Sequence, residues 1–166
     1  PWNRLSLTTG EHVYFQQNQV GPGTSLVFFH EDTLGGITKV VHNKPGFRGQ
    51  EREYLTLLTN GKFQGNDAWE VRAQSGFALV PIMHASNSDH ALVIGLGTGH
   101  SAAVVEAFGF RNIDVAEIAP GIVEAARRYF GHINGAVLDK PNVRLFLEDG
   151  RNKLLLSKQQ YDLITM

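Results

Sequence analysis

The residues best suited to bind a ligand lie in the glycine-rich stretch ALVIGLGTGHSAAVVEAF. Its apolar start predicts a buried strand, its end predicts a helix, and Gly95, Gly97 and Gly99 form the turn between them. Glycines allow a tight turn and the close approach of a ligand, and the start of a helix offers free N–H groups. The dinucleotide fingerprint places a third glycine where this chain has His100. An adenosyl-sulfonium cofactor therefore fits better than a dinucleotide, and a purely structural turn is the alternative.

Two acidic residues follow the next predicted strands. Glu117 ends the strand DVAEI and Asp149 ends the strand VRLFL. Ligands of open α/β sheets bind at the carboxyl ends of the strands, where a carboxylate can accept hydrogen bonds from ribose hydroxyls. We therefore expect Glu117 to bind the ribose and Asp149 to accept from an adenine amino group. Their neighbours Ile118 and Gly150 belong to the same predicted nucleoside site.

The elements that must position these residues alternate along the chain. Strands are predicted at 91–94, 113–118, 143–147 and 161–166, with helices at 100–108, 120–130 and 152–157 between them. Such alternation predicts a parallel sheet with right-handed crossovers. Before it, strands at 24–30, 37–42, 53–59 and 62–64, with an Asn60-Gly61 hairpin turn, predict an antiparallel module, and 68–86 reads as a helix. We divide the chain into a β-hairpin module, 1–66, and a nucleoside-binding part, 67–166.

Composition excludes several other classes of function. The chain has 166 residues, a formal net charge of −1 and no cysteine. A near-neutral balance disfavours nucleic-acid binding, and the absence of cysteine excludes disulfides and thiolate metal sites. The seven histidines form no metal-ligand spacing, so we expect no metal. No run of 18 apolar residues occurs, so this segment is not expected to contact a membrane.

Taken together, the motifs resemble the spermidine synthase family of polyamine aminopropyltransferases, in its divergent bacterial branch. The matching segments, in order, are LLTNGKFQGND, ALVIGLGTG, DVAEIAPGIVEAARRYF, VLDKPNVRLFLEDGRNKLL and YDLITM. The resemblance implies an α/β fold, with a Rossmann-like parallel sheet of the type found in S-adenosylmethionine-dependent transferases after a small β module. It also implies a cytoplasmic location and pairing into a homo-oligomer, although members of this branch are often fused to membrane segments.

Three departures from the family pattern bear on the chemistry. The acid that the family carries in the glycine loop is replaced by Thr98, and the Tyr-His pair of the preceding helix by Ala73 and Gln74. Gln74 can still donate to a cofactor, so Gln74 and Thr98 join the predicted cofactor-binding residues. The family's catalytic acid is expected one residue after Met166, so we name no catalytic residue and expect this chain to lack turnover by itself. The sheet is correspondingly expected to be incomplete.

The resemblance implies aminopropyl transfer from decarboxylated S-adenosylmethionine to a polyamine or another amine. Thr98 leaves ordinary S-adenosylmethionine and methyl transfer as an alternative, because that cofactor carries a carboxylate and needs no acid in the loop. A third hypothesis is a non-catalytic nucleoside-binding or assembly domain. His100 is either a ligand contact or a residue of the first helical turn. Asp67 and Glu70 either line a polyamine channel or, for Asp67, cap the following helix.

Overall fold

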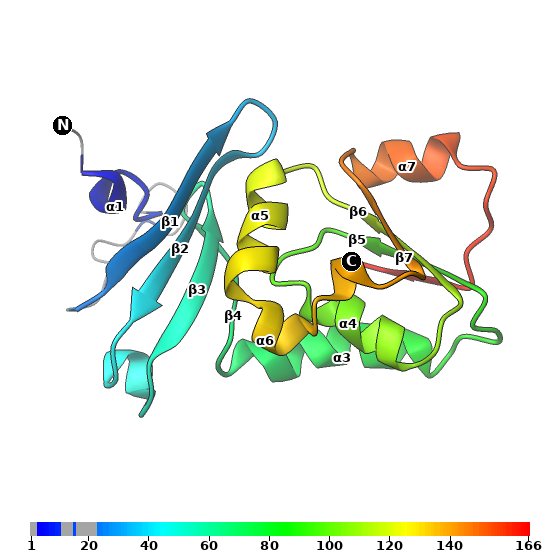
Figure 1. The fold of residues 1–166 in the computed structure, drawn as a ribbon, viewed down its shortest axis with the longest axis horizontal. Helices are drawn as coiled ribbons and strands as arrows, with labels where there is room; N and C mark the ends of the chain where they lie inside the picture. The colour runs from blue at the N-terminus through cyan, green and yellow to red at the C-terminus, as the bar shows by residue number, and fades with distance from the viewer. Residues whose placement is uncertain (1–2, 11–14, 16–22) are drawn as a thin grey trace.

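A computed structural model describes residues 3–10, 15 and 23–166, and Figure 1 shows two sheets separated by a helix. The first sheet is antiparallel, in the order β1-β2-β3-β4. Its strands are β1 (Ser25–Asp32), β2 (Gly36–Asn43), β3 (Tyr54–Thr59) and β4 (Lys62–Asn66). Both Asn60 and Gly61 have positive φ, at 50° and 76°, which is the backbone of the predicted hairpin turn. A short helix, α1 (Arg4–Leu7), precedes this sheet, and a 3-10 turn, η1 (Phe47–Gly49), follows β2.

The second sheet is parallel, in the order β7-β6-β5-β8. Its strands are β5 (His90–Ile94), β6 (Asn112–Ala116), β7 (Val143–Phe146) and β8 (Leu163–Thr165). From β5 the chain adds β6 and β7 on one side of the sheet and then β8 on the other side of β5. The glycine loop after β5 therefore lies at the switch point where open α/β sheets bind their ligands. The predicted α/β fold with an antiparallel module before a parallel sheet is confirmed.

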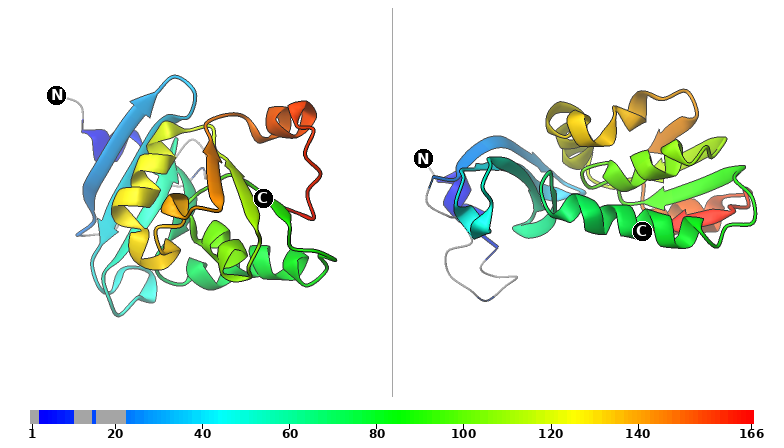
Figure 2. Two further views of the ribbon diagram at one scale, coloured as in Figure 1. Left: turned by 45° about the vertical axis from the view of Figure 1, so that its right-hand side comes forward. Right: turned by 90° about the horizontal axis from the view of Figure 1, so that it is seen from below.

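Helices lie on both faces of the parallel sheet. α3 (Glu70–Ile82) and α4 (His100–Ala107) lie on one side of it, and α7 (Gly150–Leu156) lies on the other (Figure 1). α5 (Pro120–Tyr129) lies between the two sheets and packs across one face of the first sheet (Figure 2). The predicted helices were correct in position, whereas α1, α6 (Gly131–Asn134) and the 3-10 turn η2 (Val137–Asp139) were missed. These short elements lack the length over which helical periodicity can be recognised.

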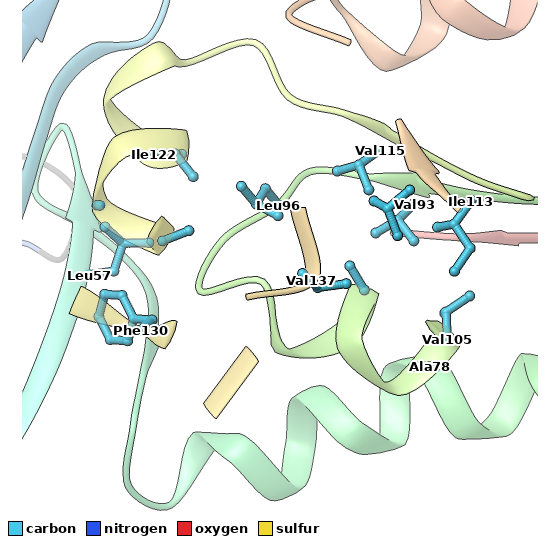
Figure 3. Close-up of a cluster of buried hydrophobic side chains, with 14 of the residues drawn as sticks. Leu57, Ala78, Val93, Leu96, Val105, Ile113, Val115, Ile122, Phe130 and Val137 are labelled. Atoms are coloured by element: carbon cyan, nitrogen blue, oxygen red, sulfur yellow. The ribbon is translucent and has the colours of Figure 1, made fainter. Parts of the chain in front are cut away.

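One hydrophobic core joins the two sheets. It runs from residues of the first sheet, such as Leu57, through Ile122 and Phe130 to Val93 and Ile113 of the second (Figure 3). The Tyr129 hydroxyl on α5 also donates to the carbonyl oxygen of Val27 in β1, at 3.0 Å. The boundary at residue 66 separates the sheets, but the division into two domains stays a prediction because the core is shared.

Candidate functional site

The glycine loop forms a tight link between β5 and α4. Gly95, Gly97 and Gly99 have φ values of 81°, 54° and 84°, a region that side chains with a Cβ rarely adopt. A Cβ on Gly99 would also lie 3.0 Å from Nδ2 of Asn134. That amide donates to the carbonyl of Thr98 at 2.8 Å, so α6 holds the loop from behind. The predicted strand–turn–helix geometry is thus present.

Glu117 is held rigidly at the end of β6. Its side chain is 5% exposed, and its two carboxylate oxygens accept from the backbone N–H groups of Leu96, at 2.8 Å, and Ala119, at 2.9 Å. A carboxylate oxygen has more than one acceptor position, so both oxygens can still accept from ligand hydroxyls. The acid therefore combines a fixed orientation with capacity to bind a diol beside the glycine loop.

Gln74 and Thr98 form a buried polar pair across the site. The Thr98 hydroxyl donates to Oε1 of Gln74 at 2.7 Å, which leaves the Gln74 Nε2 amide free to donate elsewhere. Gly65 of β4 lies directly against this pair, because a Cβ there would fall 2.2 Å from Nε2 of Gln74 and 3.0 Å from Cγ2 of Thr98. The absence of a side chain at Gly65 thus lets the first sheet approach the glycine loop.

A pocket of about 250 Å³ opens in front of these residues. Its lining residues come from β4, α3, β5, the glycine loop, α4 and the ends of β6 and β8: Gln64, Glu70, Gln74, Phe77, Ile94, Gly95, Leu96, Gly97, Thr98, Ser101, Glu117 and Met166. Five of the nine predicted cofactor-binding residues are therefore gathered in one place: Gln74, Gly95, Gly97, Thr98 and Glu117.

The other four predicted residues do not line this pocket. Gly99 lies behind the loop against Asn134, and the Ile118 side chain is 43% exposed. Asp149 caps α7 by accepting from the N–H of Asn152 at 3.0 Å. Gly150 packs against Ile94, where a Cβ would fall 2.3 Å from Cγ2. Their assignment to nucleoside binding stays a prediction.

His100 holds three helices together. Its Nδ1 lies 2.9 Å from the carbonyl oxygen of Ile133, and its Nε2 lies 2.8 Å from the Ser75 hydroxyl. The side chain thus connects α4 to α6 and to α3, and it does not line the pocket. Of the two roles considered for His100, this geometry favours a structural residue of the first helical turn over a ligand contact.

The expectation that Asp67 caps α3 is wrong. The N-cap position of α3 is Trp69, which makes no side-chain cap bond, and the side-chain oxygen of Asn66 accepts from the N–H groups of Ala68, at 3.0 Å, and Glu70, at 3.1 Å. Asp67 instead accepts from the N–H of Leu55 at 2.7 Å and lies 2.9 Å from Nε2 of His132. Asp67 is occupied by these contacts, whereas Glu70 reaches the pocket.

Of the three α3 residues that line the pocket, Gln74 was predicted to bind the cofactor and Glu70 was named as a possible channel residue, whereas Phe77 was missed. Glu70, Gln74 and Phe77 are spaced four and three residues apart, which places them on one face of a helix. This spacing was a usable signal once Gln74 had been chosen. Gln64 carried no such signal, because it reaches the pocket only through the packing of β4 against the glycine loop.

Acidic and neutral groups dominate the pocket. Among its described lining residues are two carboxylates, Glu70 and Glu117, and no lysine, arginine or histidine. Elsewhere in the described ranges, no three His, Cys, Asp or Glu side chains gather in a way that could hold a metal ion. Within those same ranges, no helix has the length and apolar character needed to cross a bilayer.

Comparison with solved structures supports the fold. Spermidine synthase from Thermotoga maritima superposes with a TM-score of 0.70 at 18% identity, over 84% of this chain and 45% of that one. A structure of spermidine synthase in complex with the transition-state analogue AdoDATO also superposes with a TM-score of 0.70 at 18% identity, covering 84% and 46% of the two chains.

Comparison of sequences gives the family. A polyamine aminopropyltransferase of Pectobacterium atrosepticum is 30% identical over 140 residues, which are 84% of this chain and 42% of the relative. One from Klebsiella pneumoniae is 33% identical over 88 residues, or 51% and 30% of the two chains. The chain thus spans less than half the length of these relatives. The model of the spermine/spermidine synthase domain matches residues 70–166, so this chain belongs to the spermine/spermidine synthase domain family.

Proposed function

We propose that the pocket binds decarboxylated S-adenosylmethionine, and that the protein transfers its aminopropyl group to a polyamine or another amine. The name of the Pectobacterium relative, polyamine aminopropyltransferase, supports this reaction, as does the AdoDATO complex of a protein with the same fold. The donor set fits a nucleoside: a rigid carboxylate, a glycine loop and the amide of Gln74 all border one pocket.

The observation that carries this proposal is the charge of the pocket wall. Decarboxylated S-adenosylmethionine has a sulfonium and an ammonium, and both are attracted to a wall with two carboxylates and no described cationic side chain. Ordinary S-adenosylmethionine has in addition a carboxylate, which would lie in the same acidic surroundings without a cationic partner. The pocket therefore favours aminopropyl transfer over methyl transfer.

When bound, the donor supplies a carbon made electrophilic by the neighbouring sulfonium. The nitrogen of the neutral acceptor amine bonds to this carbon, the carbon–sulfur bond breaks with its electron pair going to sulfur, and the resulting ammonium releases a proton to water. The chain's own residues fix the geometry of this attack. Glu117 orients the ribose, and the pair formed by Gln74 and Thr98 faces the side chain of the donor. Holding the two reacting atoms in line is the main catalytic effect open to such a site.

Binding calorimetry tests the proposal. Decarboxylated S-adenosylmethionine should bind at least about tenfold more tightly than S-adenosylmethionine, because each 1.4 kcal/mol of differential electrostatic interaction changes affinity tenfold. The opposite order would favour methyl transfer. Failure of both compounds and of 5′-methylthioadenosine to bind would refute a nucleoside site altogether.

A substitution at Glu117 tests whether the ribose binds at the end of β6. Glu117→Gln should lower the affinity for 5′-methylthioadenosine at least about tenfold, because an amide cannot accept at both of its ends. Glu31→Gln, at an exposed position of β1, is the matched control and should leave the affinity unchanged. Undiminished binding by Glu117→Gln would show that the ribose lies elsewhere.

Two features of the whole protein follow from the same proposal. We propose, on the family resemblance alone, that the protein is cytoplasmic and that its copies associate into a homo-oligomer. Light scattering of the purified protein tests the second, with a dimer as the expected species.

A further inference from the structure

The carboxylate of Glu70 is the one charged group of the pocket wall that the described contacts leave without a partner. Glu117 uses both of its oxygens on backbone N–H groups, and nearby Asp67 is occupied by Leu55 and His132. The backbone N–H of Glu70 donates to the side-chain oxygen of Asn66, and no contact among the described residues engages its carboxylate. A carboxylate beside a cavity, with no cation provided by the described residues, is suited to bind one from solution.

Its place on α3 shows which part of a ligand it meets. Glu70 lies one helical turn before Gln74, about 6 Å along the axis, and both side chains border the pocket. Phe77 lies on α3 beyond Gln74 in the other direction, and the apolar Met166 after β8 also lines the pocket. The wall of the pocket therefore changes along α3 from apolar, through the amide of Gln74, to the acid at its first turn.

Resting on the proposed function, we propose that Glu70 binds a primary alkylammonium group in the pocket and thereby selects a decarboxylated, cationic ligand. A primary ammonium has three donors and suits a single carboxylate. Two ligands carry this group, the aminopropyl end of the donor and the amine acceptor, and the same carboxylate chemistry recognises either. A ligand carboxylate in this position would be repelled.

Glu70→Gln tests the role because it keeps the size and hydrogen-bonding shape of the side chain but removes the charge. We expect the affinity for decarboxylated S-adenosylmethionine or for 1,4-diaminobutane to fall at least about tenfold, the loss typical of a charge-assisted hydrogen bond. The affinity for 5′-methylthioadenosine, which has no ammonium, should stay within about twofold. Glu70→Asp should restore part of the lost affinity.

The two ammonium sources give different patterns. A loss confined to decarboxylated S-adenosylmethionine assigns Glu70 to the donor, and a loss confined to 1,4-diaminobutane assigns it to the acceptor; either supports the proposal. Equal loss for all three ligands would overturn it, because that pattern indicates a loosened helix. So would unchanged binding of both ammonium ligands.

Two controls separate this proposal from the proposed function. Glu106→Gln, on α4 and outside the pocket, should change none of the three affinities. If 5′-methylthioadenosine binds the unaltered protein and Glu70→Gln changes nothing, the nucleoside site stands and the ammonium site fails. If 5′-methylthioadenosine does not bind at all, the proposed function itself fails.

Discussion

The Asp149 carboxylate combines a structural contact, visible in the fold, with a predicted contact to an adenine base. Its Oδ1 accepts from the N–H of Asn152 at the start of α7, and the side chain is otherwise exposed at the carboxyl end of β7. Asparagine is as good an N-cap as aspartate, but it is neutral and its second terminal group is an NH2 that donates where the carboxylate had an accepting oxygen. Asparagine therefore keeps the cap while weakening any contact with a base, and alanine loses both.

We predict that Asp149→Ala lowers the free energy of unfolding by about 1 kcal/mol, the usual value of a cap, whereas Asp149→Asn leaves it nearly unchanged. Both variants should lose the preference for 5′-methylthioadenosine over 5′-methylthioinosine, whose base lacks the amino group. Urea unfolding and calorimetry measure the two effects. If Asp149→Asn keeps the preference for adenine, Asp149 serves only as a cap.

At this scale, sequence reasoning identified residues that directly follow a strand and missed those brought in by packing. Glu117 and the glycines could be predicted because the ends of neighbouring parallel strands meet at one edge. Gln64 could not, because its place depends on how closely β4 approaches the glycine loop. Asp67 was misassigned because α3 begins only at Glu70, three residues later, and the Asp67 carboxylate accepts from the N–H of Leu55 in β3 instead.

Among the secondary-structure elements, β2 contains a buried lysine that connects it to the segment after α1. Lys39 is 2% exposed, and its ammonium donates to the carbonyl oxygen of Thr8. Burial lowers the pKa of Lys39 from 10.5 to about 8. Between those two values the unfolded chain binds more protons than the folded one, so the free energy of unfolding rises with pH there.

We predict that raising the pH from 7.5 to 9.5 increases the free energy of unfolding of the unaltered protein by about 1–2 kcal/mol more than that of Lys39→Met, in line with 1.36 kcal/mol per unit of pKa shift. Methionine keeps the length of the side chain without a titrating group. Urea unfolding at both pH values measures the difference, and Lys62→Met, at an exposed position of β4, is the control and should show the same pH dependence as the unaltered protein. A pH dependence that Lys39→Met fails to change would mean that the lysine is hydrated.

The longer elements were predictable, because their apolar residues repeat at helical spacing or run continuously through a buried strand. The tether made by Lys39 was not, because a lysine in an alternating strand is normally assigned to the solvent face. Its burial depends on α1 and the residues after it, which are far from β2 in the sequence. The short helices of this chain and its side-chain contacts between distant segments therefore could not be predicted from the sequence.

For the whole molecule, the central question is whether its two sheets form one unit. Their packing through α5 is close: a Cβ on Gly121 would lie 2.9 Å from Cβ of Thr38 and 3.0 Å from Cδ2 of His30. A second contact of this kind joins Gly35, in the turn after β1, to Ala119, where a Cβ would fall 2.3 Å from the alanine methyl. Since the pocket includes Gln64 of the first sheet, a shift between the sheets would also alter the site.

We predict that Gly121→Ala destabilises the protein by about 1–3 kcal/mol, the cost of overpacking, although alanine is the better helix former. Gly76→Ala on α3 is the matched control: a Cβ there meets nothing within 4 Å, so it should stabilise by about 0.5–1 kcal/mol. Because the core is continuous, calorimetry should show a single thermal transition that moves down in the first variant and up in the second. Two transitions, only one of which responds to Gly121→Ala, would instead establish residues 1–66 and 67–166 as independent domains.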